Sequence, residues 1–203
     1  QSLHDRWQLV ADAVAARRAE DIAACQVLGA DWLHWSLPDC IYRYHPQTGG
    51  PLYVSDPDIF GAVHPAELPL IAELQAQMAA LPPHDALIAP LTIGNHVDHA
   101  LTRRAAEAAF GIGPLWYYED YPYVQQVGAV DRVISAERGG WEGETIAFGK
   151  SALRAKIAAI NAFQSQLSTF FKDDDDLVAQ VTAFTRSVGG ERVWRQKPNR
   201  SAL

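Results

Sequence analysis

The feature that most constrains the fold is a short apolar segment followed directly by a polar loop and an amphipathic helix. Residues 85–91, DALIAPL, have the length and composition of a buried strand, and residues 92–97 form a polar loop after it. Residues 98–110 then place Leu101 and Ala105 on one helical face. Because strands that lead through a loop into a helix build parallel sheets, this segment predicts an α/β layer structure.

Further helices and strands alternate along the chain. The segments whose apolar residues recur at helical spacing are residues 9–28, 66–81, 150–171 and 177–187. The first of these is followed by Gly29, the residue type that most often stands just past a helix end. Strands are expected over residues 32–37 and 115–118. Residues 42–65 hold prolines and a Gly-Gly pair, so they are expected to form a long surface excursion.

Composition narrows the class of protein without naming an activity. The chain has 203 residues, of which 48% are hydrophobic and 20% charged, as in a folded domain. Its net charge of −7 argues against a nucleic-acid partner, and no apolar run is long enough to span a membrane. Cys25 and Cys40 lack C-x-x-C spacing and are interpreted as reduced thiols of a cytoplasmic protein.

The motif with the sharpest chemical content is His96-Val97-Asp98-His99, which follows the expected strand and begins a helix. Ligands of open α/β sheets bind beyond the carboxyl ends of the strands. Catalytic zinc sites use three protein ligands, often histidine, plus water. One histidine can therefore bind a metal while the other, oriented by the carboxylate, faces the substrate. The alternative is an ordinary helix start that Asp98 caps, with both histidines exposed.

Several segments together resemble the PIG-L/LmbE-like zinc-dependent N-deacetylases. RRAED, LGA and LPDCIYR, in residues 17–43, resemble the family's R-x-x-E … L-G … D region, and GNHVDH resembles its second metal motif. The later landmarks are residues 117–123 and 190–195 with Lys156, Ser165 and Gln166. The resemblance runs along essentially the whole chain in the right order, although Val97 stands where the family often has proline.

This resemblance implies a fold and an activity. The expected fold is a Rossmann-like three-layer α/β sandwich with a mainly parallel sheet, in a single domain spanning residues 1–203. The expected activity is hydrolysis of an N-acetyl group on an amino-sugar conjugate, with one Zn²⁺, or another divalent metal, per site. His99 would be a zinc ligand, and His96 would stabilise the oxyanion or protonate the leaving amine. Asp98 would hold His96 in the useful tautomer.

The resemblance also implies an incomplete site. The family takes a histidine and an aspartate ligand, and the general base, from an early A-H-P-D-D-type motif, and no such motif occurs in these residues. The first strand and its ligands are therefore expected to be missing at the front of the chain. The other histidines lack a comparable context and receive no metal role; they are His4, His34, His45, His64 and His84.

Other assignments remain open. Arg17 and Asp39 match family positions that reach the sugar hydroxyls, although Arg18 can equally be the matching arginine. Arg17 can instead pair with Glu20 or Asp21, and Asp39 can simply begin a turn. The aromatic residues 116–123 can line a sugar cleft or form a buried strand and a loop. The aspartates at 173–176 favour a helix N-terminus over a calcium loop.

The expected partner is a small N-acetylated sugar, with no nucleic acid and no membrane span, and a homo-oligomer is left open. The second hypothesis is a catalytically silent carbohydrate-binding relative or fragment. A metallopeptidase-like amidase is disfavoured because H-E-x-x-H is absent.

Overall fold

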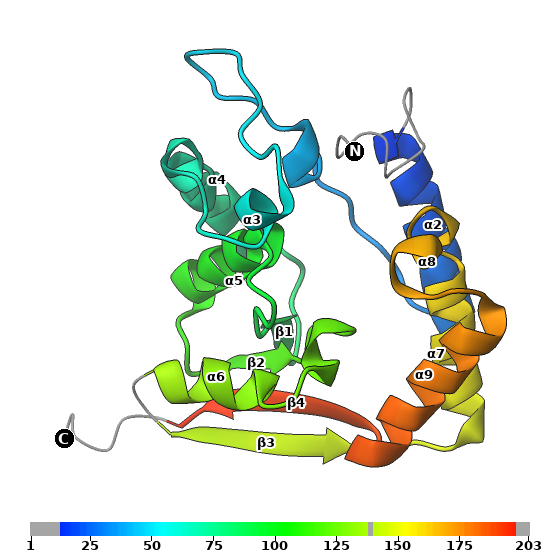
Figure 1. The fold of residues 1–203 in the computed structure, drawn as a ribbon. Coiled ribbons are helices and arrows are strands. Elements are labelled where there is room, and N and C mark those ends of the chain that lie inside the picture. The colour runs from blue at the N-terminus through cyan, green and yellow to red at the C-terminus, as the bar shows by residue number, and fades with distance from the viewer. Residues whose placement is uncertain (1–12, 138–139, 198–203) are drawn as a thin grey trace. The chain divides into compact units, whose positions relative to one another are not determined.

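The computed structural model describes residues 13–137 and 140–197, which fall into two compact units (Figure 1). The first unit holds the described residues up to Tyr42 together with Ile146–Glu191. The second holds Arg43–Thr145 and the described residues from Arg192 onward.

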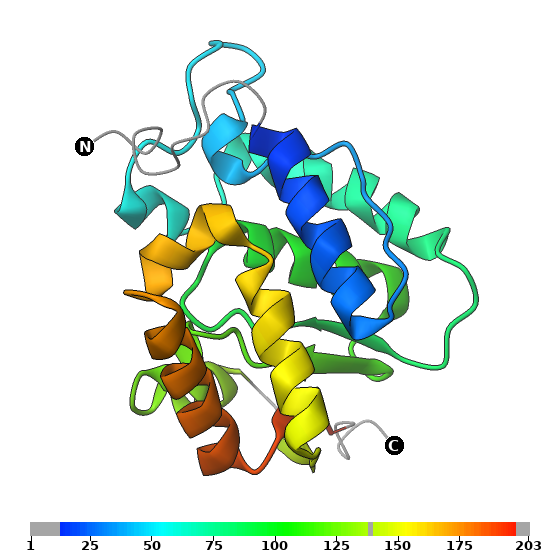
Figure 2. The same ribbon diagram turned by 90° about the vertical axis from the view of Figure 1, so that its right-hand side faces the viewer.

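The first unit is helical. Its helices are α2 (Ala13–Leu28), α7 (Lys150–Asn161), α8 (Gln164–Phe170) and α9 (Asp174–Val188), with a 3₁₀ turn, η1, at Cys40–Tyr42. α7 lies beside α2 and also packs against α9 (Figure 2). α2 ends at Gly29 as predicted, with a φ of 66° that favours glycine. The side chain of Asp173 accepts a hydrogen bond from the Asp176 N–H and starts α9, so the helix-start interpretation of these aspartates is confirmed.

The single helix predicted over residues 150–171 is wrong, because it divides into α7 and α8. Phe163, with a ψ of 57°, leaves the helical conformation between them. Glu20 of α2 then accepts hydrogen bonds from the N–H and the hydroxyl of Ser165, both at 2.7 Å. This carboxylate satisfies a backbone donor at the new helix start, so a contact distant in sequence replaces the intrahelical partner.

The strand predicted over residues 32–37 is also wrong, since this segment has no regular structure. Trp32 and Leu33 are 44% and 58% exposed. The guanidinium of Arg18 donates to the carbonyl oxygen of Trp35 at 2.9 Å. A side chain therefore takes a carbonyl that a neighbouring strand would otherwise engage.

The second unit is built around a mixed four-stranded sheet in the order β1-β2-β4-β3. The strands are β1 (Leu87–Pro90), β2 (Leu115–Tyr118), β3 (Trp141–Ile146) and β4 (Glu191–Gln196). β1 and β2 are parallel, with Leu87 opposite Leu115, whereas β2 and β4 are antiparallel. The prediction of a mainly parallel sheet thus holds for the pairing of β1 with β2, but not for the pairing of β2 with β4. The segment of β1 was predicted to be a buried strand, but among the described strands it lies at an edge, and Ile88 is 51% exposed.

Helices cover part of this sheet. α5 (Val97–Phe110) packs on β1 and β2, and α4 (Leu68–Ala79) packs on α5. The other short elements are α3 (Asp56–Ile59), η2 (Pro65–Glu67), η3 (Tyr123–Gln125) and α6 (Ala129–Ala136). Leu101 and Ala105 of α5 are buried beside Leu115 and Tyr117 of β2. The strands predicted over residues 85–91 and 115–118 and the helix predicted over residues 98–110 are therefore confirmed, with small differences in their bounds.

Residues 42–65 are more than the surface excursion that the sequence predicts. They contain α3 and an isolated bridge between Tyr44 and Pro51. Tyr53, only 3% exposed, is among their buried residues.

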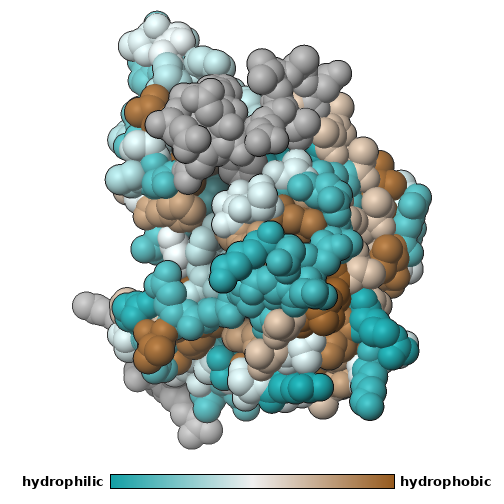
Figure 3. Space-filling view, turned by 45° about the vertical axis from the view of Figure 1, so that its right-hand side comes forward, coloured by the Kyte–Doolittle hydropathy of each residue, from teal (hydrophilic) through white to brown (hydrophobic). Residues whose placement is uncertain are grey.

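On the face drawn in Figure 3, hydrophobic residues lie in separate groups among hydrophilic ones. Within residues 13–137 and 140–197, no helix combines the length and apolar character that a membrane span requires.

Candidate active site

The loop between β1 and α5 has an unusual backbone. Thr92, Gly94 and Asn95 have φ angles of 67°, 89° and 59°. Such angles are rare for a β-branched threonine and mark local strain. A Cβ on Gly94 would lie 2.8 Å from the ring of Tyr123, so this position requires glycine for space as well as for conformation. The loop is therefore held in one specific shape directly before His96.

His96 is the residue that begins α5. Its Nδ1 accepts the N–H of Asp98 at 3.2 Å, so the ring caps the helix. An accepting Nδ1 carries no proton, which leaves the proton of the neutral ring on Nε2. Burial lowers the pKa of His96, and the electrostatic effects of His99 and Arg43 act in the same direction, opposed by Asp98 and Asp120. The site thus presents a neutral imidazole with Nε2–H as its donor.

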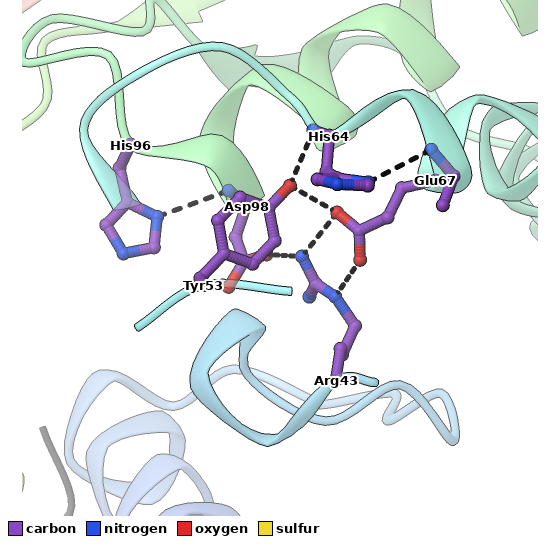
Figure 4. Close-up of polar contacts among 7 residues, drawn as sticks. Arg43, Tyr53, His64, Glu67, His96 and Asp98 are labelled. Carbon is purple, nitrogen blue, oxygen red and sulfur yellow. Dashed lines mark hydrogen bonds and ion pairs between the residues drawn. The ribbon is translucent and has the colours of Figure 1, made fainter. Parts of the chain in front are cut away.

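The carboxylate of Asp98 turns to a different partner. Its Oδ1 lies 2.6 Å from a terminal nitrogen of Arg43, as Figure 4 shows. The resemblance implies that the Asp98 carboxylate orients His96, but in this structure the contact with His96 comes from the Asp98 main chain.

Arg43 is the centre of a buried polar network. Its guanidinium also binds Glu67, which accepts the hydroxyl of Tyr53 at 2.6 Å. The Tyr53 oxygen in turn accepts the N–H of His64 at 2.9 Å (Figure 4). Arg43, Tyr53 and Glu67 are each at most 7% exposed, so the network is buried. Through the contact of Arg43 with Asp98, it joins the segment before α4 to the first turn of α5.

His99 is held by a carboxylate that the sequence analysis did not assign a role. Nδ1 of His99 lies 2.5 Å from Oδ1 of Asp120, and the other carboxylate oxygen accepts the N–H of Ile93 at 2.8 Å. The Asp120 side chain is fully buried, whereas the His99 side chain is 31% exposed. Since Nδ1–H donates to Asp120, the lone pair of Nε2 is available, which is the usual state of a metal-ligating histidine.

A cavity of about 720 Å³ in the second unit is lined by residues 92–95, the loop that directly precedes His96. Phe60 and Tyr123 line it, and their rings also lie near the site. Phe60 is 5.5 Å from His96 and Tyr123 is 6.5 Å from His99, measured between ring centroids. The His96 and His99 centroids are 5.1 Å apart. The two predicted histidines are thus brought together, with the rings of Phe60 and Tyr123 near them.

Arg17 and Asp39 belong to the first unit, where they influence one another. Burial lowers the pKa of Arg17, and the Asp39 and Glu20 carboxylates oppose this effect. Nε of Arg17 lies 4.0 Å from Glu20, so the pairing that the sequence offered as an alternative does occur. Lys156 has a structural partner in the same unit, an ion pair with Glu191.

The remaining described histidines have local partners. His34 contacts Asp21 at 2.7 Å, and His84 contacts the Pro82 carbonyl at 2.8 Å. His45 and His64 accept backbone N–H groups two residues further along. His4 lies outside the described residues. In the aromatic stretch, Trp116–Tyr118 lies in the strand β2, and Tyr123 borders the cavity.

Comparisons with known proteins point to one activity class. No family model matches the chain. The chain is 29% identical over 184 residues to 2'-N-acetylparomamine deacetylase of Streptomyces fradiae, covering 88% of this chain and 60% of that protein. The fold matches the zinc-inhibited form of teicoplanin deacetylase Orf2 with a TM-score of 0.78 and 25% identity. This match covers 98% of this chain and 80% of that one.

The chain is similar to these deacetylases in sequence and in fold. A third deacetylase, the A40926 pseudoaglycone deacetylase Dbv21, matches with a TM-score of 0.65 and 25% identity over 97% of this chain and 78% of that one. The family-level resemblance expected from the sequence, and its α/β fold, are thereby confirmed. The chain spans about 60% of the length of the curated relative it matches.

Proposed function

We propose that the intact protein is a metal-dependent amide hydrolase that removes an N-acetyl group from an amino-sugar conjugate. The observation that carries this proposal is the His99–Asp120 pair, which leaves Nε2 of a half-exposed histidine free to bind a metal beside His96. The relatives named as deacetylases support the choice of reaction.

His99 would hold a divalent metal, and we propose zinc. When bound, such an ion lowers the pKa of water and polarises an amide carbonyl. The donor set fits, because a buried carboxylate fixes the metal-binding tautomer of His99. One relative was solved in a zinc-inhibited form, so the metal requirement calls for titration with zinc and with other divalent ions over a range of concentrations.

His96 would act on the substrate oxygen. Its neutral ring carries the proton on Nε2, so it donates a hydrogen bond to the charge that develops on the amide oxygen. Because burial lowers its pKa, stabilisation of the oxyanion suits this residue better than delivery of a proton from a standing imidazolium. Asp98 would support it through the main-chain contact.

The remaining ligands and the general base are proposed to come from residues beyond these 203. Two findings support this: the relatives are longer than this chain, and β1 has a strand on one side only among the described residues. Within the described part of the second unit, no three side chains of histidine, cysteine, aspartate or glutamate lie close enough together to share one metal ion. Arg17 and Asp39 are proposed to bind sugar hydroxyls.

The second candidate is a silent carbohydrate-binding relative. The experiment is to incubate the intact protein with a panel of N-acetylated amino sugars and to measure acetate release, with and without a chelator. Metal-dependent release supports the enzyme, whereas sugar binding without release supports the alternative. We also propose a cytoplasmic protein, because its two cysteines lack the spacing of a disulfide framework, and the oligomeric state can be measured in the same sample.

A further inference from the structure

We propose that Arg43 is a positioning residue that keeps the carboxylate of Asp98 away from His96. This inference rests on the proposed function, in which the neutral Nε2–H of His96 is the hydrogen-bond donor to the substrate oxygen. Arg43 acts on His96 through Asp98, whose carboxylate it binds and whose main-chain N–H His96 accepts.

The first step is a competition for Nδ1 of His96. The ring now accepts the peptide N–H of Asp98, which requires an unprotonated Nδ1. The carboxylate of the same residue is a stronger hydrogen-bond acceptor in the immediate neighbourhood. If it turned to Nδ1, the proton would move there, and Nε2 would become an acceptor unable to stabilise an oxyanion.

The second step is the way Arg43 resolves this competition. Its guanidinium lies 2.6 Å from Oδ1 of Asp98 and 3.2 Å from Oε2 of Glu67. A planar fork of donors can bridge two carboxylates in this way, whereas a lysine ammonium is a single point charge. The Asp98 side chain is 25% exposed, so it is not fully enclosed, and the ion pair with Arg43 fixes where its Oδ1 lies.

The third step is the anchor that holds the fork in place. Glu67 is 4% exposed and accepts both Arg43 and the hydroxyl of Tyr53. Separating one member of such a buried charged group from the others would leave a buried charge uncompensated, which is costly. The members are therefore held in one arrangement. Arg43 therefore transmits a fixed geometry from the segment before α4 to the first turn of α5 (Figure 4).

The test uses Arg43→Lys in the intact, metal-loaded protein. The tautomer of His96 is measured by ¹⁵N NMR of the labelled imidazole nitrogens, and kcat and KM are measured on an N-acetylated amino sugar. We expect the proton to shift from Nε2 towards Nδ1, with kcat lowered at least tenfold and KM within about twofold. An unchanged tautomer in this variant would overturn the proposal.

A matched control is Arg103→Lys. Arg103 is also 7% exposed and binds two carboxylates, Glu107 and Glu137, but neither is linked to His96 by a described contact. We expect Arg103→Lys to lower the Tm by about as much as Arg43→Lys does, while His96 keeps the tautomer of the wild-type protein. A tautomer shift in this control as large as in Arg43→Lys would attribute the effect to general loosening and overturn the proposal.

Asp98→Asn gives a second measurement in case Arg43→Lys does not fold. Asparagine keeps the main-chain N–H and weakens the competing acceptor, so Nε2 should stay protonated and kcat should fall only a few-fold. Loss of this tautomer would show that the carboxylate itself orients His96, against the proposal. If the wild-type protein releases no acetate, the proposed function fails, whereas the NMR measurements still decide the role of Arg43.

Discussion

Replacing Asp120 by asparagine should weaken metal binding without removing any metal ligand. The side chains have nearly the same shape, but the carboxylate of Asp120 receives two N–H donors, from Ile93 and from Nδ1 of His99. An amide offers one oxygen and one NH₂ group, so only one of these donors keeps an acceptor. Ile93 is 2% exposed, and its backbone N–H cannot turn away, so the oxygen should stay with it.

The NH₂ group of the variant would then face Nδ1 of His99. The ring can satisfy it only by moving its own proton to Nε2, the nitrogen that is needed for the metal. Loss of such a supporting group costs about 10- to 100-fold in metal affinity. This corresponds to about 1.4–2.8 kcal/mol at about 1.4 kcal/mol per tenfold.

The affinity is measured by competition with a chromogenic chelator, using the intact protein. Asp58→Asn is the matched control, because Asp58 also accepts a backbone N–H and a second donor, from Val54 and Ser55, but does not contact His99. A dissociation constant for Asp120→Asn within twofold of the wild type would refute the tautomer argument. An equal weakening in both variants would refute it as well.

Three further changes test the site. His99→Ala should abolish tight metal binding, whereas His96→Ala should keep the metal and lower turnover by about two to four orders of magnitude, as measured by metal analysis and kinetics. Equal metal loss in both variants would contradict this division. Gly94→Ala should destabilise the protein by about 2–5 kcal/mol, because alanine is strained at a φ of 89° and its Cβ meets the ring of Tyr123. A Tm within 1–2 °C of the wild type, on a scale of about 2–4 °C per kcal/mol, would contradict the steric argument.

The fold could be predicted where local pattern and burial agree. The apolar residues of 115–118 alternate into a buried core, and the structure places β2 over the same residues. β3 and β4 were not predicted, because their sequences are largely polar and each is a strand through its pairing with a neighbouring strand. The Arg195 guanidinium lies 2.9 Å from Glu142, and Gly143 leaves space for the ring of Trp194. Neither contact can be inferred from residue periodicity.

The candidate site shows the same division. His96 and His99 stand in one short motif, so the sequence alone indicated them. Asp120 and Arg43 lie far from that motif in the chain, and only the folded structure brings them to it. Asp120 could have been suspected as a polar residue just after a strand that neighbours β1, since sites gather at this edge of a sheet. Nothing comparable marks Arg43, because its role depends on a buried network that joins three separate segments.

Among the described strands β1 lies at an edge of the sheet, and this has a consequence for handling the protein. Unpaired backbone groups on an edge strand attract other strands, and natural proteins commonly protect such edges with charge, proline or brevity. β1 is four residues long and ends in Pro90, which lacks an N–H, but its exposed Ile88 carries no charge. Samples limited to these residues should therefore associate edge to edge as the concentration rises. A lysine at position 88 should improve their solubility.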